Sequence, residues 1–211
     1  MRYLVTGGAG CIGTNVIKRI LSDGNEVISL DNYSTGLRDN EQEGCRYIDG
    51  DIHQMKYWGK RLEEQDLIPD VIIHLAALAR IQPSIKNPEL TIENNFNGTL
   101  QVLQYAKEHD IQIIYAGSSS KHHGLYGSPY AWSKYGGEEL CKLYSEVYGL
   151  NTTICRFYNV YGPHQIEDGD YNTVIGYFEK LYRENKPLTI TGDGEQRRDF
   201  THVDDIVDGI I

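Results

Sequence analysis

Tyr130 and Lys134 are the residues best placed by type and spacing to move a proton. They lie four positions apart in a segment with helical periodicity, so both project from one face of a helix. A lysine cation beside a tyrosine favours the phenolate, and such a phenolate can act as a general base near neutral pH. The serines at positions 118–120 end the preceding apolar segment and can add a hydroxyl at the same place.

A second pair, Tyr182 and Lys186, has the same spacing. Because the chain contains 16 tyrosines, pairs of this kind also arise by chance, and no run of serines precedes the second one. We therefore interpret Tyr182 and Lys186 as part of a solvated helix face.

Three glycines, Gly7, Gly10 and Gly13, stand between an apolar strand segment and an amphipathic helix segment. Glycines at this junction let a pyrophosphate approach the backbone at the helix N-terminus. Asp31 ends the next apolar segment, 18 residues after Gly13. A carboxylate there accepts hydrogen bonds from ribose hydroxyls and repels a 2′-phosphate, which favours NAD over NADP.

The elements that must position these residues alternate between apolar runs and helix-period segments. This order predicts an α/β fold with a doubly wound parallel sheet of the Rossmann type, whose ligands bind at the carboxyl ends of the strands. The predicted strands are 3–6, 26–30, 45–48, 71–75, 111–116 and 152–157, and the predicted helices are 11–22, 53–65, 88–109 and 129–148. Beyond Gly162 we expect a helix over 172–184 and a strand over 188–191.

Length and composition limit the class of protein. The 211 residues suffice for one α/β domain and part of a second. The net charge of −10 disfavours nucleic acid as a partner, and no apolar run approaches the about 18 residues of a membrane span. Four cysteines without metal-ligand spacing indicate reduced thiols in a cytoplasmic protein and no metal site.

Several segments follow one another in the order of a known family. They are VTGGAGCIG, LDNYSTG, GDI at 50–52, HLAA at 74–77, NNFNGTL, the serine triple, YAWSK, RFYNVYGPHQ and GDGEQRRDFTHVDD. The chain resembles the extended short-chain dehydrogenase/reductases, in their NAD-dependent nucleotide-sugar epimerase/dehydratase branch. The resemblance implies an NAD-binding domain over 1–165 and the start of a substrate-binding region over 166–211. Because the chain stops inside a predicted helix, we expect that region to be truncated.

The resemblance also implies roles for matching residues, with Tyr130 as base and Lys134 on the nicotinamide ribose. It implies that the cofactor pyrophosphate is bound by Gly7, Gly10, Cys11, Ile12 and Gly13. It also implies that the ribose is bound by Asp31 and Asn32, and that the adenine is flanked by Asp51 and Ile52. By the same resemblance, the rest of the dinucleotide cleft is lined by Leu75, Ala76, Ala77 and Asn94, and the substrate phosphates are bound by Asn159 and Arg198.

The catalytic hydroxyl can be aligned in three ways, because the stretch before Tyr130 is shorter than the family pattern. Counting along the strand gives Ser118, counting back from Gly124 gives Ser119, and position within the triple gives Ser120. We favour Ser118, because strand registers slip less than loops.

The function implied is C4 epimerisation of a UDP-hexose through a 4-keto intermediate. A 4,6-dehydratase or decarboxylase is the first alternative, although the dehydratase pattern places Asp-Glu just after the catalytic hydroxyl, where this chain has serine and lysine or histidine. A catalytically silent NAD-binding module is the second. The helices over 88–109 and 129–148 are expected to form a homodimer interface.

Overall fold

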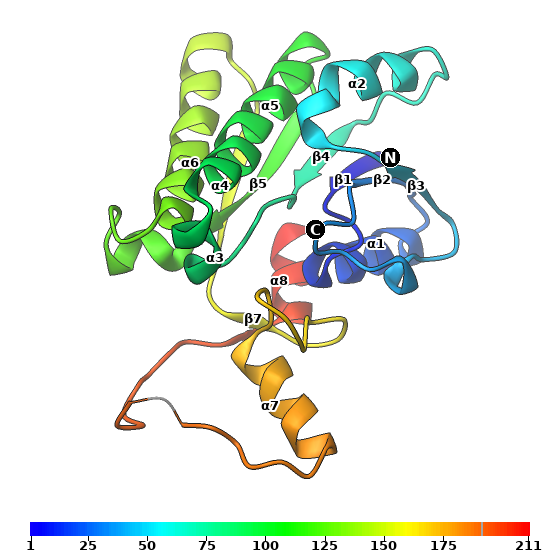
Figure 1. The fold of residues 1–211 in the computed structure, drawn as a ribbon. Coiled ribbons are helices and arrows are strands. Elements are labelled where there is room, and N and C mark those ends of the chain that lie inside the picture. The colour runs from blue at the N-terminus through cyan, green and yellow to red at the C-terminus, as the bar shows by residue number, and fades with distance from the viewer. Residues whose placement is uncertain (191) are drawn as a thin grey trace.

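The computed structural model describes residues 1–190 and 192–211, apart from the side chain of residue 123. Its centre is a parallel six-stranded sheet in the order β3-β2-β1-β4-β5-β6 (Figure 1). The strands are β1 (Arg2–Thr6), β2 (Glu26–Asp31), β3 (Cys45–Asp49), β4 (Val71–His74), β5 (Gln112–Ser118) and β6 (Thr152–Phe157). This order reverses direction between β1 and β4, which confirms the predicted doubly wound sheet.

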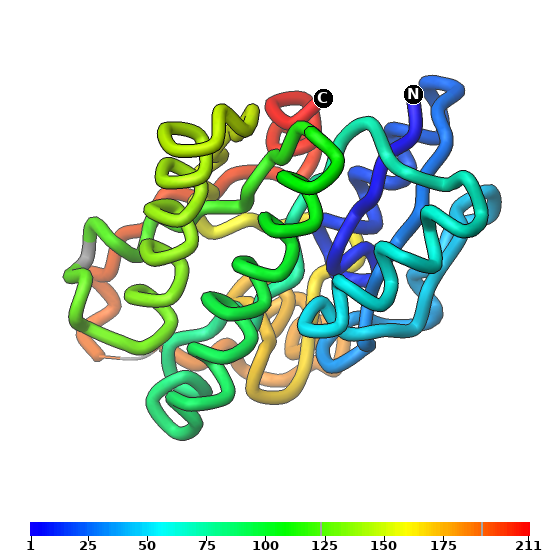
Figure 2. Tube along the Cα trace, turned by 90° about the horizontal axis from the view of Figure 1, so that it is seen from above, coloured from blue at the N-terminus to red at the C-terminus, as the bar shows by residue number. Residues whose placement is uncertain are grey.

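Helices cover both faces of the sheet, so its central strands are apolar on both sides. Leu4 and Ile72 face a core shared with α2 (Met55–Glu63), α5 (Gly98–Glu108) and α6 (Pro129–Tyr148). Val5 and Ile73, the next residues along, face a second core shared with α1 (Cys11–Ser22) and α8 (Val203–Ile210). Seen from above, α5 and α6 lie side by side (Figure 2).

The predicted helix over 88–109 is interrupted. The structure has α3 (Ile81–Lys86), α4 (Pro88–Ile92), a π-helical turn over Glu93–Asn97, and then α5. Within the π-helical turn, the Asn95 side chain accepts a hydrogen bond from the Leu78 amide (2.8 Å) and donates to the Leu78 carbonyl (3.1 Å). The turn therefore fixes the loop that follows β4.

The C-terminal part contains α7 (Val174–Arg183) and a small parallel sheet of β7 (Val160–Tyr161) and β8 (Thr201–His202). The predicted helix over 172–184 is therefore confirmed as α7. The predicted strand over 188–191 is wrong for residues 188–190, which form no strand, and residue 191 lies outside the described part. Leu188 and Ile190 alternate as in a strand but are exposed, and the described part of the chain offers no neighbouring strand for them to pair with.

The last helix returns to the first one. Val203, Val207 and Ile210 of α8 join the core around α1, and Arg19 of α1 forms an ion pair with Asp208 (2.5 Å). Within the described residues, no helix combines the length and apolar character that a membrane span requires.

Candidate active site

A cleft of about 790 Å³ opens at the carboxyl ends of the sheet strands, a size typical of sites for small ligands. All but one of the residues predicted to bind cofactor or substrate line it. They are Gly7, Gly10, Cys11, Ile12, Gly13, Asp31, Asn32, Ile52, Leu75, Ala76, Ala77, Asn94, Ser118, Ser119, Tyr130, Lys134, Asn159 and Arg198. The exception is Asp51, whose carboxylate accepts hydrogen bonds from the Asn32 side chain (2.9 Å) and the His53 amide (2.9 Å).

The glycine turn between β1 and α1 has no room for side chains. Gly7 has a φ of +75°, and a Cβ there would lie 2.8 Å from the Ala76 amide nitrogen. A Cβ on Gly13 would lie 2.3 Å from the Gly7 carbonyl oxygen. Gly10 precedes the first turn of α1, and no side chain caps that helix end. The amides of the first turn therefore face the cleft without a cap, which fits a pyrophosphate.

Asp31 is fixed where a ribose would lie. One carboxylate oxygen accepts a hydrogen bond from the Ala9 amide (2.9 Å) and the other from the Tyr33 amide (2.8 Å). Burial raises the pKa of Asp31, and these two hydrogen bonds act in the opposite direction. The nearby Arg38 lies 4.1 Å from the centre of the Tyr33 ring and pairs with Asp49. Arg38 is thus engaged by Asp49 and is not among the described residues that line the cleft, and this absence of a cleft cation beside Asp31 fits NAD.

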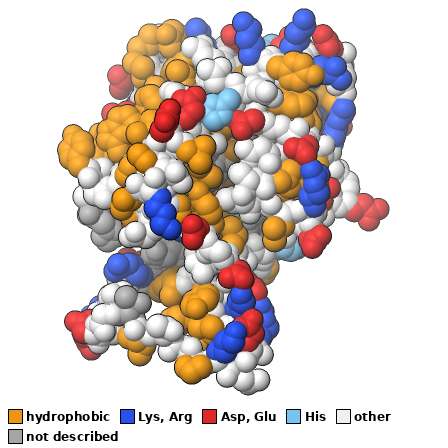
Figure 3. Space-filling model, in the orientation of Figure 1, with side chains coloured by type: hydrophobic (Ala, Val, Ile, Leu, Met, Phe, Trp, Pro, Cys, Tyr) orange, Lys and Arg blue, Asp and Glu red, His pale blue; other side chains and the backbone are white. Residues whose placement is uncertain are grey.

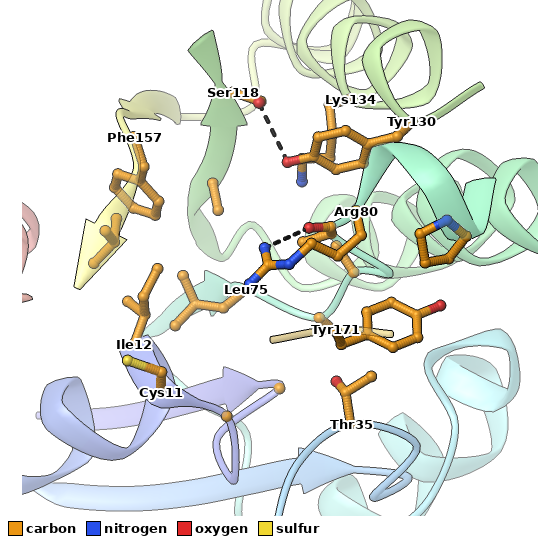
Figure 4. A pocket seen from close by; sticks show the side chains of 18 of the residues that line it. Cys11, Ile12, Thr35, Leu75, Arg80, Ser118, Tyr130, Lys134, Phe157 and Tyr171 are labelled. Carbon is orange, nitrogen blue, oxygen red and sulfur yellow. Dashed lines mark hydrogen bonds between the residues drawn. The ribbon is translucent and has the colours of Figure 1, made fainter. Parts of the chain in front are cut away.

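The predicted catalytic tyrosine and one of the three serines are in contact. The Tyr130 hydroxyl donates a hydrogen bond to Ser118 Oγ (3.2 Å), as Figure 4 shows. Ser118 Oγ also accepts from the Ser120 amide (3.2 Å) and donates to Ser120 Oγ (2.9 Å). Ser119 lines the cleft, but the hydrogen bond to Tyr130 is made by Ser118.

Helix α6 carries Tyr130 and Lys134 on its first turns. Ser128 caps the helix by accepting a hydrogen bond from the Ala131 amide (3.1 Å), and Pro129 follows at the first position. Burial raises the pKa of Tyr130, while the Ser118 hydrogen bond and the charge of Arg80 lower it. Burial lowers the pKa of Lys134 to about 8. The surroundings in the cleft therefore shift the pKa values of Tyr130 and Lys134 away from those of the free side chains.

Glu138, one turn beyond Lys134, is a supporting residue that sequence reasoning missed. Its carboxylate is 1% exposed and accepts hydrogen bonds from Arg156 of β6 (2.9 Å) and Lys121 of the turn after β5 (3.2 Å). Burial alone raises the pKa of this carboxyl, but the two cations outweigh it and hold the pKa below its ordinary value. Its position four residues after Lys134 was the available signal. The network joins α6, β6 and the serine turn.

Arg80 also enters the cleft without having been predicted. Its Nε donates to the Asn172 carbonyl (3.0 Å) and its Nη1 to the Ala79 carbonyl (2.7 Å). Figure 4 shows its side chain between Tyr130 and Tyr171. Tyr171 and Asn172 belong to the loop before α7, so Arg80 connects this loop to the segment after β4. No pattern in the sequence indicated this contact.

The residues predicted for the substrate phosphates lie just before the two strands of the small second sheet. Asn159 precedes β7 and donates to the Asp199 carbonyl (2.8 Å), while Arg198 lies just before β8. The pairing of β7 with β8 brings these two segments together at the cleft. In the described part of the chain, no group of His, Cys, Asp or Glu side chains is arranged to hold a metal ion.

Together, the doubly wound sheet, the glycine turn and the Tyr130–Ser118 contact beside Lys134 define a dinucleotide-dependent enzyme of the Rossmann type. The sequence matches the model of the NAD dependent epimerase/dehydratase family over residues 3–211. The chain belongs to this family, and its cofactor is NAD.

The chain is similar to relatives with related activities. It is 36% identical to a UDP-glucuronate 4-epimerase of Thermodesulfobacterium geofontis, over 99% of this chain and 70% of the relative. The structure matches a UDP-glucose 4-epimerase of Thermotoga maritima with UDP-glucose (TM-score 0.92, 29% identity, 100% of this chain and 72% of that one). It also matches a Thermus thermophilus UDP-glucose 4-epimerase in complex with NAD (TM-score 0.87, 30% identity, 99% and 72%).

Proposed function

We propose that this protein is an NAD-dependent nucleotide-sugar epimerase that inverts C4 of a UDP-hexose. The observation that carries the proposal is the hydrogen bond between Tyr130 and Ser118, with Lys134 on the same helix, inside the cleft that begins at the glycine turn. The similarity to enzymes named UDP-glucose and UDP-glucuronate 4-epimerase supports the reaction and the nucleotide.

The roles of the residues follow from their chemistry. The Tyr130 phenolate accepts the proton of the sugar 4-hydroxyl, and Ser118 orients that oxygen by hydrogen bonding. Lys134 stabilises the phenolate by its charge and binds the nicotinamide ribose. Bound NAD would supply a hydride acceptor that is regenerated in each cycle, and Tyr130 would give the proton back to the 4-oxygen when the hydride returns to the opposite face of C4.

The substrate phosphates are assigned to Asn159 and Arg198, because both line the cleft. A guanidinium suits phosphate through its forked N–H donors. With the nucleotide held in this way, the sugar can turn over within the cleft between the two hydride transfers.

The dehydratase alternative is less well supported. Eliminating water needs an added acid and base next to the catalytic hydroxyl. The residues after Ser118 are Ser119, Ser120 and Lys121, and Lys121 is engaged by Glu138. The carboxylates that this chemistry requires are not at those positions.

We also propose that the protein forms a homodimer in the cytoplasm. Leu90 of α4 and Leu143 and Val147 of α6 are exposed apolar side chains, and Figure 3 shows hydrophobic side chains gathered on that side of the molecule. Burying them between two copies would remove this apolar surface from water. The four cysteines are free, which supports a reducing compartment. Light scattering that shows a monomer at micromolar concentration would contradict the dimer.

The test of the function is to incubate the chain with NAD and UDP-galactose and to separate the products by chromatography. We expect UDP-glucose with no change in mass. A product that has lost water would establish the dehydratase instead. If the chain binds NAD but neither binds nor converts a UDP-sugar, it is a silent NAD-binding module and the proposal is wrong.

A further inference from the structure

The buried ammonium of Lys134 lies over the face of an aromatic ring. Its Nζ is 4.3 Å from the centre of the Tyr115 ring, which is within the range of a cation–π interaction. Both residues are buried, and Tyr115 belongs to strand β5. Among the residues that the structure describes, none forms a hydrogen bond or an ion pair with the Lys134 side chain. Because a buried charge without a partner is costly, the ring is the group that stabilises this ammonium.

Tyr115 also contacts the backbone of the same lysine. Its hydroxyl donates a hydrogen bond to the Lys134 carbonyl (3.3 Å). Helix α6 leaves room for this hydroxyl at Gly137, where a Cβ would lie 2.6 Å from the ring carbon that carries it. Glycine inside a helix is destabilising relative to alanine, so the helix gives up some stability to admit the ring. The two contacts hold the ring against the part of α6 that carries Lys134.

Strand β4 places a histidine beside this pair, and the histidine is neutral. The centre of the His74 ring lies 5.7 Å from that of the Tyr115 ring. Burial and the charge of Lys134 lower the pKa of His74 to about 3. Both of its ring nitrogens are hydrogen-bonded to threonine hydroxyls, those of Thr6 (2.7 Å) and Thr99 (2.9 Å). His74 therefore brings no second charge to Lys134.

Helix α6, which the structure describes over its whole length, carries the other titratable neighbours of Lys134, and none of them is a free carboxylate. Burial raises the pKa of the Cys141 thiol to about 12, so this thiol is neutral. The Glu138 carboxylate is shared between two other cations. The remaining neighbour on this helix is Tyr130, the proposed base. The aromatic ring therefore takes the place that an acidic side chain has beside many lysines.

An aromatic partner suits a lysine whose charge has to act on a phenolate. A carboxylate would stabilise the ammonium but cancel its charge, so that the Tyr130 phenolate would gain little from it. A ring attracts the ammonium through its quadrupole and carries no net charge. The full positive charge therefore remains available to Tyr130, which lies next to Lys134 in the cleft (Figure 4).

A pair of the same geometry at the surface shows what burial adds. Lys107 Nζ also lies 4.3 Å from the centre of an aromatic ring, that of Tyr148. Both of these residues are exposed, so water solvates the ammonium and competes with the ring. A cation–π interaction is strongest where the cation is desolvated, as it is at Lys134.

We propose that Tyr115 is a positioning residue of the active site, which keeps Lys134 protonated and in place through a cation–π interaction without reducing its charge. The inference rests on the proposed function for the catalytic role of Lys134. The contact itself can be tested without any sugar.

The experiment is an NMR titration of the chain labelled with ¹³C at the lysine ε-carbons, with the Lys134 signal identified by its loss in Lys134→Met. Tyr115→Leu should lower the pKa of Lys134 by about 1 to 1.5, which corresponds to a desolvated cation–π contact. Tyr115→Phe keeps the ring face and should leave this pKa nearly unchanged. Tyr105→Leu is the matched control, because it removes a buried tyrosine of the same core whose ring lies against His109 instead (4.7 Å).

A fluorinated ring separates electrostatics from shape. Replacing Tyr115 by 3,4,5-trifluorophenylalanine nearly keeps the size of the ring but withdraws electrons from its face. The pKa of Lys134 should therefore be lower in this variant than in Tyr115→Phe. Thermal unfolding checks that each variant is folded, and the two phenylalanine variants still give the comparison if Tyr115→Leu does not fold.

The outcomes separate the inference from the function on which it rests. An unchanged Lys134 pKa in Tyr115→Leu would overturn the inference, and so would equal falls in Tyr115→Leu and Tyr105→Leu. If the fluorinated ring gave the same pKa as Tyr115→Phe, the ring would act by shape alone and the inference would be wrong. In wild type and Tyr115→Leu, the alkaline limb of the pH profile for turnover should follow the pKa of Lys134. If the wild-type chain converts no UDP-sugar, the proposed function fails, while the titration still decides whether Tyr115 stabilises the ammonium.

Discussion

Replacing Asp31 by asparagine tests how the cleft distinguishes NAD from NADP. In the wild-type chain the carboxylate is buried and held by the Ala9 and Tyr33 amides at 2.9 Å and 2.8 Å. The remaining lone pairs of its oxygens are free to accept hydrogen bonds from ribose hydroxyls. Asp31→Asn keeps the size and one carbonyl oxygen but removes the charge.

The size of the effect differs between the two cofactors. A hydrogen bond to a charged group contributes about 1.5–3 kcal/mol and a neutral one about 0.5–1.5 kcal/mol, so NAD affinity should fall by about 5- to 10-fold. Two unit charges 4 Å apart repel by about 4 kcal/mol at the effective dielectric of a protein surface, so the carboxylate should disfavour a 2′-phosphate by about 1,000-fold. Removing the charge should therefore narrow the preference for NAD over NADP by about 1,000-fold or more.

The assay is fluorescence titration with NADH and NADPH, on wild type and variant whose folding is checked by thermal unfolding. Asp39→Asn is the matched control, because Asp39 is exposed and its replacement changes the net charge equally. Equal or tighter binding of NADPH by the wild type would refute the role assigned to Asp31. If Asp39→Asn narrowed the preference as much, the effect would belong to net charge and not to the ribose site.

Three further perturbations test the base, the buried lysine and the supporting network. Tyr130→Phe should lower turnover by about 10²–10⁴-fold with NAD affinity nearly unchanged. Tyr182→Phe, at a residue that is 79% exposed, should have no effect on turnover. Full activity in both variants would contradict the mechanism. Lys134→Met should raise the free energy of unfolding of the NAD-free chain at pH 7, because burial destabilises the charged lysine. This destabilisation is fully present below the folded pKa of about 8, and it fades as the pH rises towards the ordinary pKa of 10.5. Urea unfolding at pH 7 and pH 10 measures this, and a gain that does not shrink with rising pH would show that the lysine is not destabilised by burial. Glu138→Gln should lower the free energy of unfolding by about 1–3 kcal/mol, because two cations lose their buried partner. Glu139→Gln, at an exposed side chain, should lower it by less than about 0.5 kcal/mol. Similar losses in both variants would show that the Glu138 network does not stabilise the fold.

The sheet and the dinucleotide turn could be predicted because local sequence determines them. A parallel strand covered on both faces must be apolar along its whole length, and 71–75 stands out for that reason. The helices over 11–22 and 129–148 begin and end as predicted. The second of them ends at Gly149, whose φ of +72° is the left-handed conformation that glycine adopts readily at a helix end. The glycine turn needs close backbone approach, which only glycine permits at Gly7 and Gly13.

Features that depend on distant contacts could not be predicted. The π-helical turn over Glu93–Asn97 exists because Asn95 bonds to Leu78, seventeen positions away. The predicted strand over 188–191 had the right residue types, but its residues 188–190 have no partner strand among the residues that the structure describes. Arg80 approaches Tyr130 only after the segment following β4 and the loop before α7 have come together, and neither segment alone indicates this.

The choice among the three serines depends on the sheet, because loop spacing alone leaves three alignments open. Strand β5 stays paired with β6 up to the step where Ser118 lies opposite Phe157, and the chain then turns into a short 3-10 helix. The register therefore fixes the direction of the Ser118 side chain, because a shift by one residue would send it to the other face of the sheet. Beneath this end of the strand, Glu138 holds Arg156 of β6 and Lys121 of the turn. A hydroxyl at the last paired position is thus oriented by the sheet itself, whereas Ser119 and Ser120 follow the turn. This supports Ser118 as the partner of Tyr130 in catalysis.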